Sequence, residues 1–356
     1  MIEVLHLYRP TVPSVRAQSI QVLGTCHGLA SNGCRVTLLA QGSGSVTNAL
    51  AAHDLEPVAN LDLRLGPADN PALAGWWFRG QVASWLHRTR GTRRVVFARA
   101  KRYADQLRSL PVKVPLVLEA HEVDSAQLRE RGLPSEGARA LEARVLARSA
   151  AVVTNCAGTL ELLRATHPDL PPCTAVHNAT AASRVRKHRP SSPSVVGYAG
   201  SLRAYKGRTT LVAAARTLAD EVRVELVGGS ADERASLVHQ GLHLVGEVPY
   251  QDVPDRLATW AGALLPLDDD LFGRHLCNPL KLWDYLAVGV PVVAADLPSV
   301  REVLGDREAA WFRPQNPESL VAAMRRVARG EQPGVQRLRT WGDRARELMA
   351  VLESVT

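Results

Sequence analysis

Two short segments in the second half of the sequence place basic residues where a phosphate group could bind. In the first segment, Gly200 and Ser201 follow a short apolar run, and Arg203 and Lys206 come next. A glycine lets the backbone approach a ligand closely, and the two positive charges suit a diphosphate. The alternative is an ordinary connection from strand to helix with two exposed basic side chains.

The second segment begins at Asn278 and Pro279 and continues as a predicted helix from Leu280. Proline suits the first turn of a helix, where amide groups lack partners and the positive end of the helix dipole attracts an anion. Lys281 adds a charge there, and Asp284, one turn further on, could accept hydrogen bonds from ribose hydroxyls. The alternative is that Lys281 and Asp284 form only a surface ion pair.

Alternating strand and helix patterns surround both segments. Strands are predicted at 2–8, 35–40, 95–98, 115–119, 151–154 and 174–177, and helices at 17–31, 99–110, 138–147 and 158–165. The polar residues 178–194 are typical of a linker. Strands at 194–198, 222–227, 242–245, 262–266 and 291–294 then alternate with helices at 209–218, 231–239, 253–260, 280–288 and 317–329. We therefore predict an α/β protein with two doubly wound domains, which bind ligands at the carboxyl ends of their strands.

The length and charge of the chain restrict the classes of partner. A chain of 356 residues suits two domains. The net charge of +8 is concentrated between residues 79 and 108, which favours nucleic acid, anionic lipid or a phosphorylated small molecule. Nucleic acid is the weakest of the three, because only 5% of residues are aromatic and no nucleic-acid-binding motif is present. An ordinary solvated surface explains the same charge. The basic residues of this run include Arg88, Arg90, Arg93, Arg94, Arg99, Lys101 and Arg102.

The cysteines and the hydrophobic segments indicate the compartment. No pair of cysteines has the spacing of a metal or redox motif, which predicts reduced thiols and a cytoplasmic protein. The cysteines are Cys26, Cys34, Cys156, Cys173 and Cys277. No signal sequence and no apolar stretch of about 18 residues is found, so we expect no insertion in a membrane. Peripheral contact with the inner face of an anionic membrane remains open.

Five motifs together resemble the retaining family-4 glycosyltransferases, also called glycosyl transferases group 1, over nearly the whole chain. The motifs are PSVRAQSIQVLGTCHGLASNGCRVTLL near the start, EAHE at 119–122, GSLRAYKG, VGEVPYQDVPDRLATWAGALLPL, and NPLKLWDYLAVGVPVVAADLPSVREVL. The resemblance implies the GT-B fold, in which two Rossmann-like domains face each other across a cleft. It implies an acceptor-side domain at 1–182, a nucleotide-sugar-binding domain at 183–334, and a last helix at 335–356 that returns to the first domain.

The resemblance also implies roles for the residues of the two basic segments. Lys206 matches the lysine that binds the diphosphate of the donor, and Arg203 takes the place of the family's arginine, which is offset by a few positions. Asp284 matches the second acid of the family's paired-acid motif, which binds the ribose. Leu276 stands where the first acid is expected, so backbone groups of residues 278–281 are expected to take a larger share of phosphate binding.

Further roles follow from the same resemblance in the first domain. His121 matches a cleft histidine that contacts the donor sugar, although an isolated histidine is more often structural. Its neighbours Glu119 and Glu122 could orient it or bind a basic loop. Ser14 and Arg16, with Val15 between them, lie in a loop expected near the donor phosphate and the acceptor, or form only a stiff connector. Arg99 is expected to meet an acceptor phosphate or only to cap the end of a helix.

Three consecutive acidic residues could form a metal site, but a loop is the favoured interpretation. Asp268, Asp269 and Asp270 could hold magnesium beside a diphosphate. The surrounding motifs resemble a fold that neutralises the leaving group with basic residues and a helix end, so we expect no metal and no cofactor.

The resemblance implies a retaining hexosyltransferase. A nucleotide diphosphate sugar is the expected donor, and the acceptor is a glycan, a lipid-linked molecule or a small molecule. Two alternatives remain open, a nucleotide-sugar epimerase of the same fold and a non-catalytic protein that binds nucleotide sugars. The sequence leaves the donor sugar, its base and the acceptor undefined.

Overall fold

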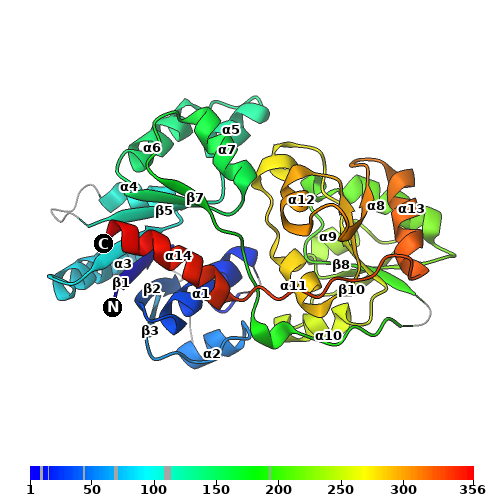
Figure 1. Ribbon diagram of the computed structural model, residues 1–356, viewed down its shortest axis with the longest axis horizontal. Coiled ribbons are helices and arrows are strands. Elements are labelled where there is room, and N and C mark those ends of the chain that lie inside the picture. The colour runs from blue at the N-terminus through cyan, green and yellow to red at the C-terminus, as the bar shows by residue number, and fades with distance from the viewer. Residues whose placement is uncertain (9–10, 15, 43–44, 68–70, 108–113, 192–193) are drawn as a thin grey trace. The chain divides into compact units, whose positions relative to one another are not determined.

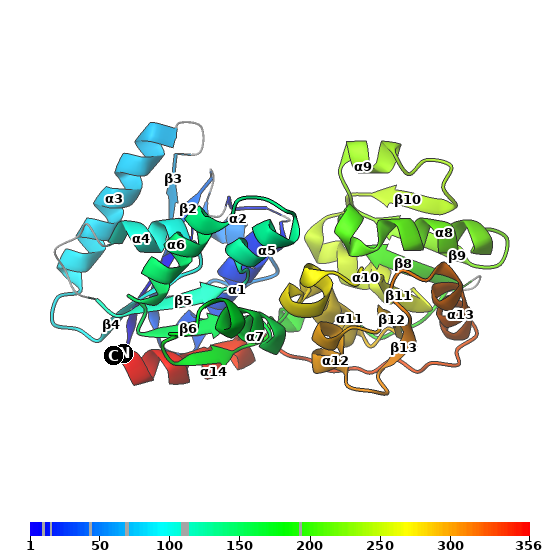
Figure 2. The same cartoon turned by 90° about the horizontal axis from the view of Figure 1, so that it is seen from above.

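The chain folds into two α/β units. The computed structural model describes residues 1–356 except 9–10, 15, 43–44, 68–70, 108–113 and 192–193. The first unit comprises Met1–Ala181 and Thr340–Thr356, and the second comprises Ala182–Arg339 (Figures 1 and 2). The first unit is thus made of two segments that are far apart in the sequence.

The first unit is built on a sheet of seven parallel strands in the order β3-β2-β1-β4-β5-β6-β7. The strands are β1 (Glu3–Leu7), β2 (Arg35–Gln41), β3 (Leu61–Gly66), β4 (Arg94–Ala98), β5 (Leu116–Ala120), β6 (Ala151–Thr154) and β7 (Cys173–Ala175). The central strands are runs of buried Val, Leu and Ala, as expected for a parallel sheet that is covered on both faces. Their carboxyl ends lie along one edge, which is where such sheets place ligand-binding residues.

The helices of the first unit cover this sheet. They are α1 (Ala17–Ser31), α2 (Val46–Ala51), α3 (Pro71–Arg88), α4 (Lys101–Gln106), α5 (Asp124–Glu130), α6 (Glu136–Leu146), α7 (Ala157–Thr166) and α14 (Trp341–Val355). The predicted bounds of α1 agree with the structure. No element was predicted between residues 41 and 94, where the structure has α2, β3 and α3. The strand β3 lies at the edge of the sheet, and its Asp62 and Arg64 interrupt the apolar pattern.

The last helix, α14, packs against the first helix, α1. Two glycines of α1 make the close approach possible. A Cβ atom at Gly24 would lie 2.2 Å from the ring of Trp341, and a Cβ atom at Gly28 would lie 2.2 Å from the backbone oxygen of Trp341. Because neither position has room for a larger residue, the two glycines set the distance between the helices.

The second unit contains a sheet of six parallel strands in the order β10-β9-β8-β11-β12-β13. The strands are β8 (Val195–Ala199), β9 (Arg223–Val227), β10 (Leu242–Gly246), β11 (Gly262–Leu265), β12 (Val292–Ala295) and β13 (Ala309–Phe312). The helices are α8 (Arg208–Leu218), α9 (Ala231–Ala235), α10 (Val253–Leu257), α11 (Leu280–Val288), α12 (Pro298–Leu304) and α13 (Pro317–Ala328). Most of the buried Val, Leu and Ala side chains of this unit form one core around the sheet.

The sequence predicts α11 with the bounds that the structure has, but α9 and α10 are shorter than predicted. In α9 a capping box between Ser230 and Glu233 fixes the start, while His239, predicted to be helical, has a φ of +60° and lies outside the helix. The elements α12 and β13 were not predicted. In the described part of the chain, no helix is both long enough and apolar enough to cross a membrane.

Candidate functional site

The second unit brings its two basic segments together at the carboxyl end of β8. Gly200, the residue after β8, has a φ of +109°, and a Cβ atom there would lie 3.4 Å from Nζ of Lys281. Nζ of Lys206 donates a hydrogen bond to Oγ of Ser201 at 3.1 Å. The two lysines are close enough for the charge of Lys206 to lower the pKa of Lys281. The two segments therefore share one site.

Both lysines are partly withdrawn from water. Burial lowers the pKa of Lys281 well below its ordinary value, and its Nζ lies 3.5 Å from the centroid of the Tyr198 ring. Burial also lowers the pKa of Lys206, and the positive charge of Arg203 adds to this effect. Among the described residues, neither lysine nor Arg203 forms an ion pair with a carboxylate. Positive charge that is desolvated and has no counter-ion indicates an anion site.

The loop that bears Lys206 is fixed by a glycine and by an aromatic contact. Gly207 has a φ of +73°, and a Cβ atom there would lie 1.3 Å from the backbone oxygen of Pro266, so no larger residue fits. The ring of Tyr205 packs edge-on against Phe272, with centroids 4.9 Å apart. These contacts hold the short helical turn Ala204–Lys206 against the loop after β11.

The start of α11 offers backbone groups to this site. Pro279 is the N-cap residue and Leu280 is the first helical residue. The N–H of Leu282 donates to the backbone oxygen of Pro279 at 3.1 Å, and the amides of Leu280 and Lys281 come before any acceptor of the helix ladder. The side chain of Asn278 is buried, and its Oδ1 accepts a hydrogen bond from Nε1 of Trp283 at 3.0 Å. Asn278 therefore holds the loop with its side chain. Leu276, at the position of the expected first acid, is also buried.

The sequence predicts that Asp284 is free to bind the ribose. In the structure its carboxylate instead forms an ion pair with an arginine. Asp284 is buried, and Nε and Nη2 of Arg184 donate to its two oxygens at 2.7 Å and 3.1 Å. Arg184 is itself fully buried and lies over the ring of Tyr250 at 3.8 Å. A buried guanidinium requires a counter-ion, and Asp284 supplies it. The alternative surface ion pair with Lys281 is wrong for the same reason. Arg184 was missed because it lies in the polar stretch predicted as a linker.

In the first unit, His121 lies just after the carboxyl end of β5. Its side chain is 10% exposed, and its Nε2 lies 3.1 Å from Oε1 of Glu119. Burial lowers the pKa of His121 to about 4, and the nearby charge of Arg99 acts in the same direction, while Glu119 opposes it. The imidazole is therefore neutral at neutral pH, so that it can act as a hydrogen-bond donor or acceptor but not as a cation.

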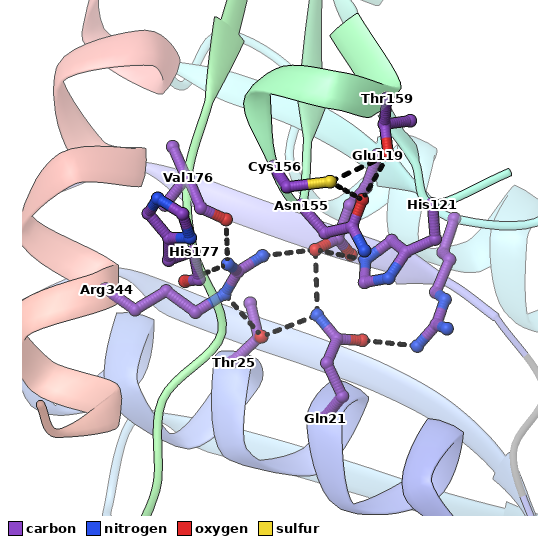
Figure 3. A network of polar contacts seen from close by, with 11 residues as sticks. Gln21, Thr25, Glu119, His121, Asn155, Cys156, Thr159, Val176, His177 and Arg344 are labelled. Carbon is purple, nitrogen blue, oxygen red and sulfur yellow. Dashed lines mark hydrogen bonds and ion pairs between the residues drawn. The ribbon is translucent and has the colours of Figure 1, made fainter. Parts of the chain in front are cut away.

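Glu119 is the centre of a buried polar network around His121 (Figure 3). Its Oε1 accepts hydrogen bonds from Nε2 of Gln21, at 2.8 Å, and from Nη2 of Arg344. Burial alone would raise the pKa of Glu119, but His121, Arg344 and Arg99 outweigh burial and hold it below its usual range. The carboxylate is therefore ionised. Sequence reasoning missed both partners: Gln21 lies inside the first quoted motif but had no role assigned to it, and Arg344 lies outside the five motifs.

The residues predicted near the acceptor lie in the first unit. Oγ of Ser14 accepts a hydrogen bond from the backbone N–H of Arg16 at 3.2 Å, and the side chain of Arg16 is exposed at the start of α1. Val15 is outside the described residues. Arg99 precedes Ala100, the N-cap residue of α4 (Lys101–Gln106), and its Nη1 donates to Oε1 of Gln21 at 2.5 Å. Arg99 therefore belongs to the network around His121.

The run of three acids after β11 is part of a structured loop. Asp269 pairs with Arg274, whose Nη2 lies 2.7 Å from its Oδ2. Oδ1 of Asp270 accepts from the backbone N–H of Gly273 at 2.7 Å. Burial raises the pKa of Asp268, and the charge of Asp270 adds to this effect. Over the described residues, no three His, Cys, Asp or Glu side chains are grouped so that they could hold a metal ion.

The predicted basic run is divided between internal and exposed residues. Arg94 donates to the backbone oxygen of Leu86, and Lys101 pairs with Asp124 and Glu142. Other basic residues of this run are exposed: Arg79, Arg88, Arg90, Arg93 and Arg102. Arg108 is outside the described residues. The exposed charge available to a partner is therefore smaller than the sequence indicates.

Comparison with protein families finds a match within the second unit. Residues 193–329 match the family described as "Glycosyl transferases group 1", a range that includes both basic segments. The second unit is therefore similar to the group 1 glycosyltransferases, the family that the motifs predict. A search of curated protein sequences found no match.

Solved structures extend the similarity from the second unit to both units. Sucrose-phosphate synthase from Thermosynechococcus elongatus is 16% identical with a TM-score of 0.73, and the alignment covers 99% of this chain and 96% of that one. HepE of Anabaena, solved with UDP-glucose, is 14% identical with a TM-score of 0.68, and covers 99% and 95%. WaaG, a glycosyltransferase involved in lipopolysaccharide biosynthesis, is 12% identical with a TM-score of 0.64, and covers 99% and 99%. These matches confirm the GT-B fold.

Proposed function

We propose that the protein is a glycosyltransferase that takes its sugar from a nucleotide diphosphate donor bound by Lys206 and Lys281. One observation supports this proposal most strongly: two partly buried ammonium groups, that of Lys281 beside Gly200 and that of Lys206 on Ser201, have no carboxylate partner in the described chain. A diphosphate supplies the missing negative charge. UDP-glucose is the first donor to test, because HepE was solved in complex with it.

The same residues account for the chemistry of transfer. When the bond from the anomeric carbon to the diphosphate breaks, negative charge grows on the leaving oxygen. Lys206, Lys281, Arg203 and the amino end of α11 stabilise this charge, which is electrostatic catalysis by preorganised groups. The neutral imidazole of His121 contacts the hydroxyls of the hexose. We propose retention by attack from the same face, with the departing phosphate taking the proton of the acceptor.

The acceptor that we propose is a sugar-containing molecule, either a glycan, a lipid-linked saccharide or a small molecule. WaaG, which has the same fold, is involved in lipopolysaccharide biosynthesis. Ser14 and Arg16 remain the residues that we propose for the acceptor loop. Incubation with UDP-glucose and a panel of mono- and oligosaccharides, followed by mass spectrometry, identifies the product.

Isothermal titration with UDP and UDP-glucose tests the donor site. Lys281→Met and Lys206→Met each remove one positive charge from the site, and we expect the affinity for UDP to fall about ten- to hundredfold, as for a lost charge-assisted hydrogen bond. Lys187→Met is the matched control, because Lys187 is an exposed lysine of the same unit. It should bind UDP like the unchanged protein.

The stability of these variants separates a binding role from a structural one. A lysine that is desolvated and lacks a counter-ion costs free energy, so Lys281→Met should leave the unfolding temperature of the free protein unchanged or raise it. If Lys281 served only to stack on Tyr198, the same change would lower that temperature and leave UDP binding intact. That pair of results would defeat the assignment of the donor site.

Two features of the site favour a second candidate function, binding of a nucleotide sugar without transfer. Leu276 replaces the expected first acid, and the carboxylate of Asp284 is occupied by Arg184. Binding of UDP-glucose without release of UDP in the presence of any acceptor would support this candidate. Conversion of the donor to an isomeric nucleotide sugar would instead identify an epimerase.

A further inference from the structure

A buried arginine of the last helix is linked to the histidine that follows β5. Arg344 lies on α14, and its guanidinium reaches Glu119, which lies next to His121 (Figure 3). We propose that Arg344 is a positioning residue for His121 and acts through the carboxylate of Glu119. This inference rests on the proposed function, in which His121 contacts the donor sugar.

The guanidinium of Arg344 is held on several sides, so its position is fixed. The side chain is fully buried. Its Nη1 donates to the backbone oxygens of Val176 and His177 at 2.5 Å and 2.6 Å, and its Nε donates to Oγ1 of Thr25 at 3.2 Å. Its Nη2 donates to Glu119. These partners come from α1, β5 and the segment after β7, and they leave the guanidinium little freedom to turn.

The carboxylate of Glu119 is fixed in turn by Arg344 and Gln21. An isolated buried carboxylate is costly, and two donors in a fixed arrangement offset that cost. The amide of Gln21 is itself oriented, because its Oε1 accepts from Arg99 and its Nε2 also donates to Oγ1 of Thr25 at 3.2 Å. Glu119 thus presents its charge to His121 from one defined position.

The contact between Glu119 and His121 depends on this support. Nε2 of His121 is 3.1 Å from Oε1 of Glu119, but the atoms do not form a well-aligned hydrogen bond. The attraction is therefore mainly electrostatic, and its strength depends on how much of the negative charge Arg344 neutralises. Without Arg344, the carboxylate would draw a proton to the imidazole more strongly.

Three charged groups act on the pKa of His121 from the elements packed around it. Glu119 on β5 raises its pKa, whereas Arg99 after β4 and Arg344 on α14 lower it. His6 on β1 is fully buried, and burial lowers its pKa to about 4, so it is uncharged at neutral pH. Burial, together with two positive charges against one negative charge, keeps the imidazole neutral. Loss of Arg344 changes this balance to one against one.

A double-mutant cycle monitored by NMR tests the proposal. The chain has 11 histidines, so the His121 signal is assigned by its loss in a His121→Gln variant. Arg344→Gln should raise the pKa of His121 by about one unit or more, a tenfold gain in proton affinity. In the double variant with Glu119→Gln, the pKa should return to within about half a unit of the original value, because the attracting carboxylate is gone.

Each outcome of this cycle supports or overturns the proposal. An unchanged titration of His121 in Arg344→Gln would overturn it, and so would an equal rise in the double variant. If Arg344→Gln does not fold, Arg344→Met takes its place, with a rise in the same direction, because it also removes the charge. The double variant leaves no unpaired charge at this pair and is expected to fold. An unchanged titration in whichever Arg344 variant folds would count against the proposal.

A second measurement separates this inference from the proposed function. UDP binding depends on lysines of the second unit, so Arg344→Gln should change the affinity for UDP less than about twofold. The turnover number with UDP-glucose should fall while KM stays nearly constant. If the unchanged protein fails to bind UDP, the proposed function is wrong, but the titration of His121 still decides whether Arg344 acts on it. If an Arg344 variant raises the pKa of His121 but keeps a normal turnover number, Arg344 is not a positioning residue for the reaction.

Discussion

At the level of single residues, the buried charges of Lys206 and Lys281 have no counter-ion in the described chain, and a bound anion would supply one. Burial lowers the pKa of both ammonium groups. A bound diphosphate would raise these pKa values again, because an opposite charge favours the protonated form. Proton binding and diphosphate binding at this site are therefore coupled.

This coupling predicts proton uptake when UDP binds. Because the pKa values of both lysines are lowered in the free protein, it loses these protons at a lower pH than the complex does, so the affinity for UDP should fall as the pH rises through the interval between the two. Calorimetry in two buffers with different ionisation enthalpies measures the uptake. Binding heats that do not depend on the buffer, together with an affinity that is constant through this pH range, would contradict the prediction. Lys187→Met is the control, and it should keep both the proton uptake and the pH dependence of the affinity for UDP.

At the level of elements, the contact between α1 and α14 requires the absence of side chains at two positions. Gly28→Ala would push a methyl group against the backbone of Trp341, which cannot give way as a flexible side chain would. We expect a loss of about 1–3 kcal/mol in the free energy of unfolding of the first unit, as for overpacked interiors.

The control for this change is the same substitution on an exposed helix. Gly80 on α3 is exposed and has no atom within 4 Å of an added Cβ atom. Gly80→Ala should therefore raise the stability by about 0.5–1 kcal/mol through helix propensity. Urea denaturation of both variants compares the two effects. Equal changes in both variants would show that the contact with Trp341 has no special weight.

The sequence is sufficient to predict elements whose signals are local. The helices α1 and α11 have the predicted bounds, because apolar periodicity and flanking Gly or Pro residues define them. The edge strand β3 and the short pair α12 and β13 have weaker patterns and were missed. The ion pair of Arg184 with Asp284 spans 100 residues, and that of Arg344 with Glu119 spans 225. No local pattern records a partner so far away, so the polar networks had to be found in the structure.

At the level of the whole molecule, the first unit depends on residues that follow the second unit in the chain. Thr180 and Thr340 form a parallel β-bridge, so the segment that leaves the first unit pairs with the one that returns. After the return, α14 supplies Trp341 and Arg344 to the first unit. The second unit, Ala182–Arg339, lies between Thr180 and Thr340 in the sequence.

Deletion of residues 340–356 should therefore destabilise the first unit and spare the second. The deletion uncovers the glycine face of α1 and leaves Glu119 buried without its guanidinium partner, which costs several kcal/mol. Limited proteolysis with mass spectrometry should show cleavage within residues 1–181, while UDP titration reports on the second unit. Deletion of only residues 353–356, which keeps Leu352, is the control. Equal resistance of the first unit in both proteins would contradict the prediction.

The return of α14 also sets an order of events on the ribosome. Glu119 is synthesised 225 residues before Arg344, so at about 5–20 residues per second it waits roughly ten to forty-five seconds for its partner. During that interval the nascent sheet of the first unit holds a carboxylate whose main counter-charge has not been made. All residues of the second unit are synthesised before the last residues of the first unit, although the second unit begins later in the sequence.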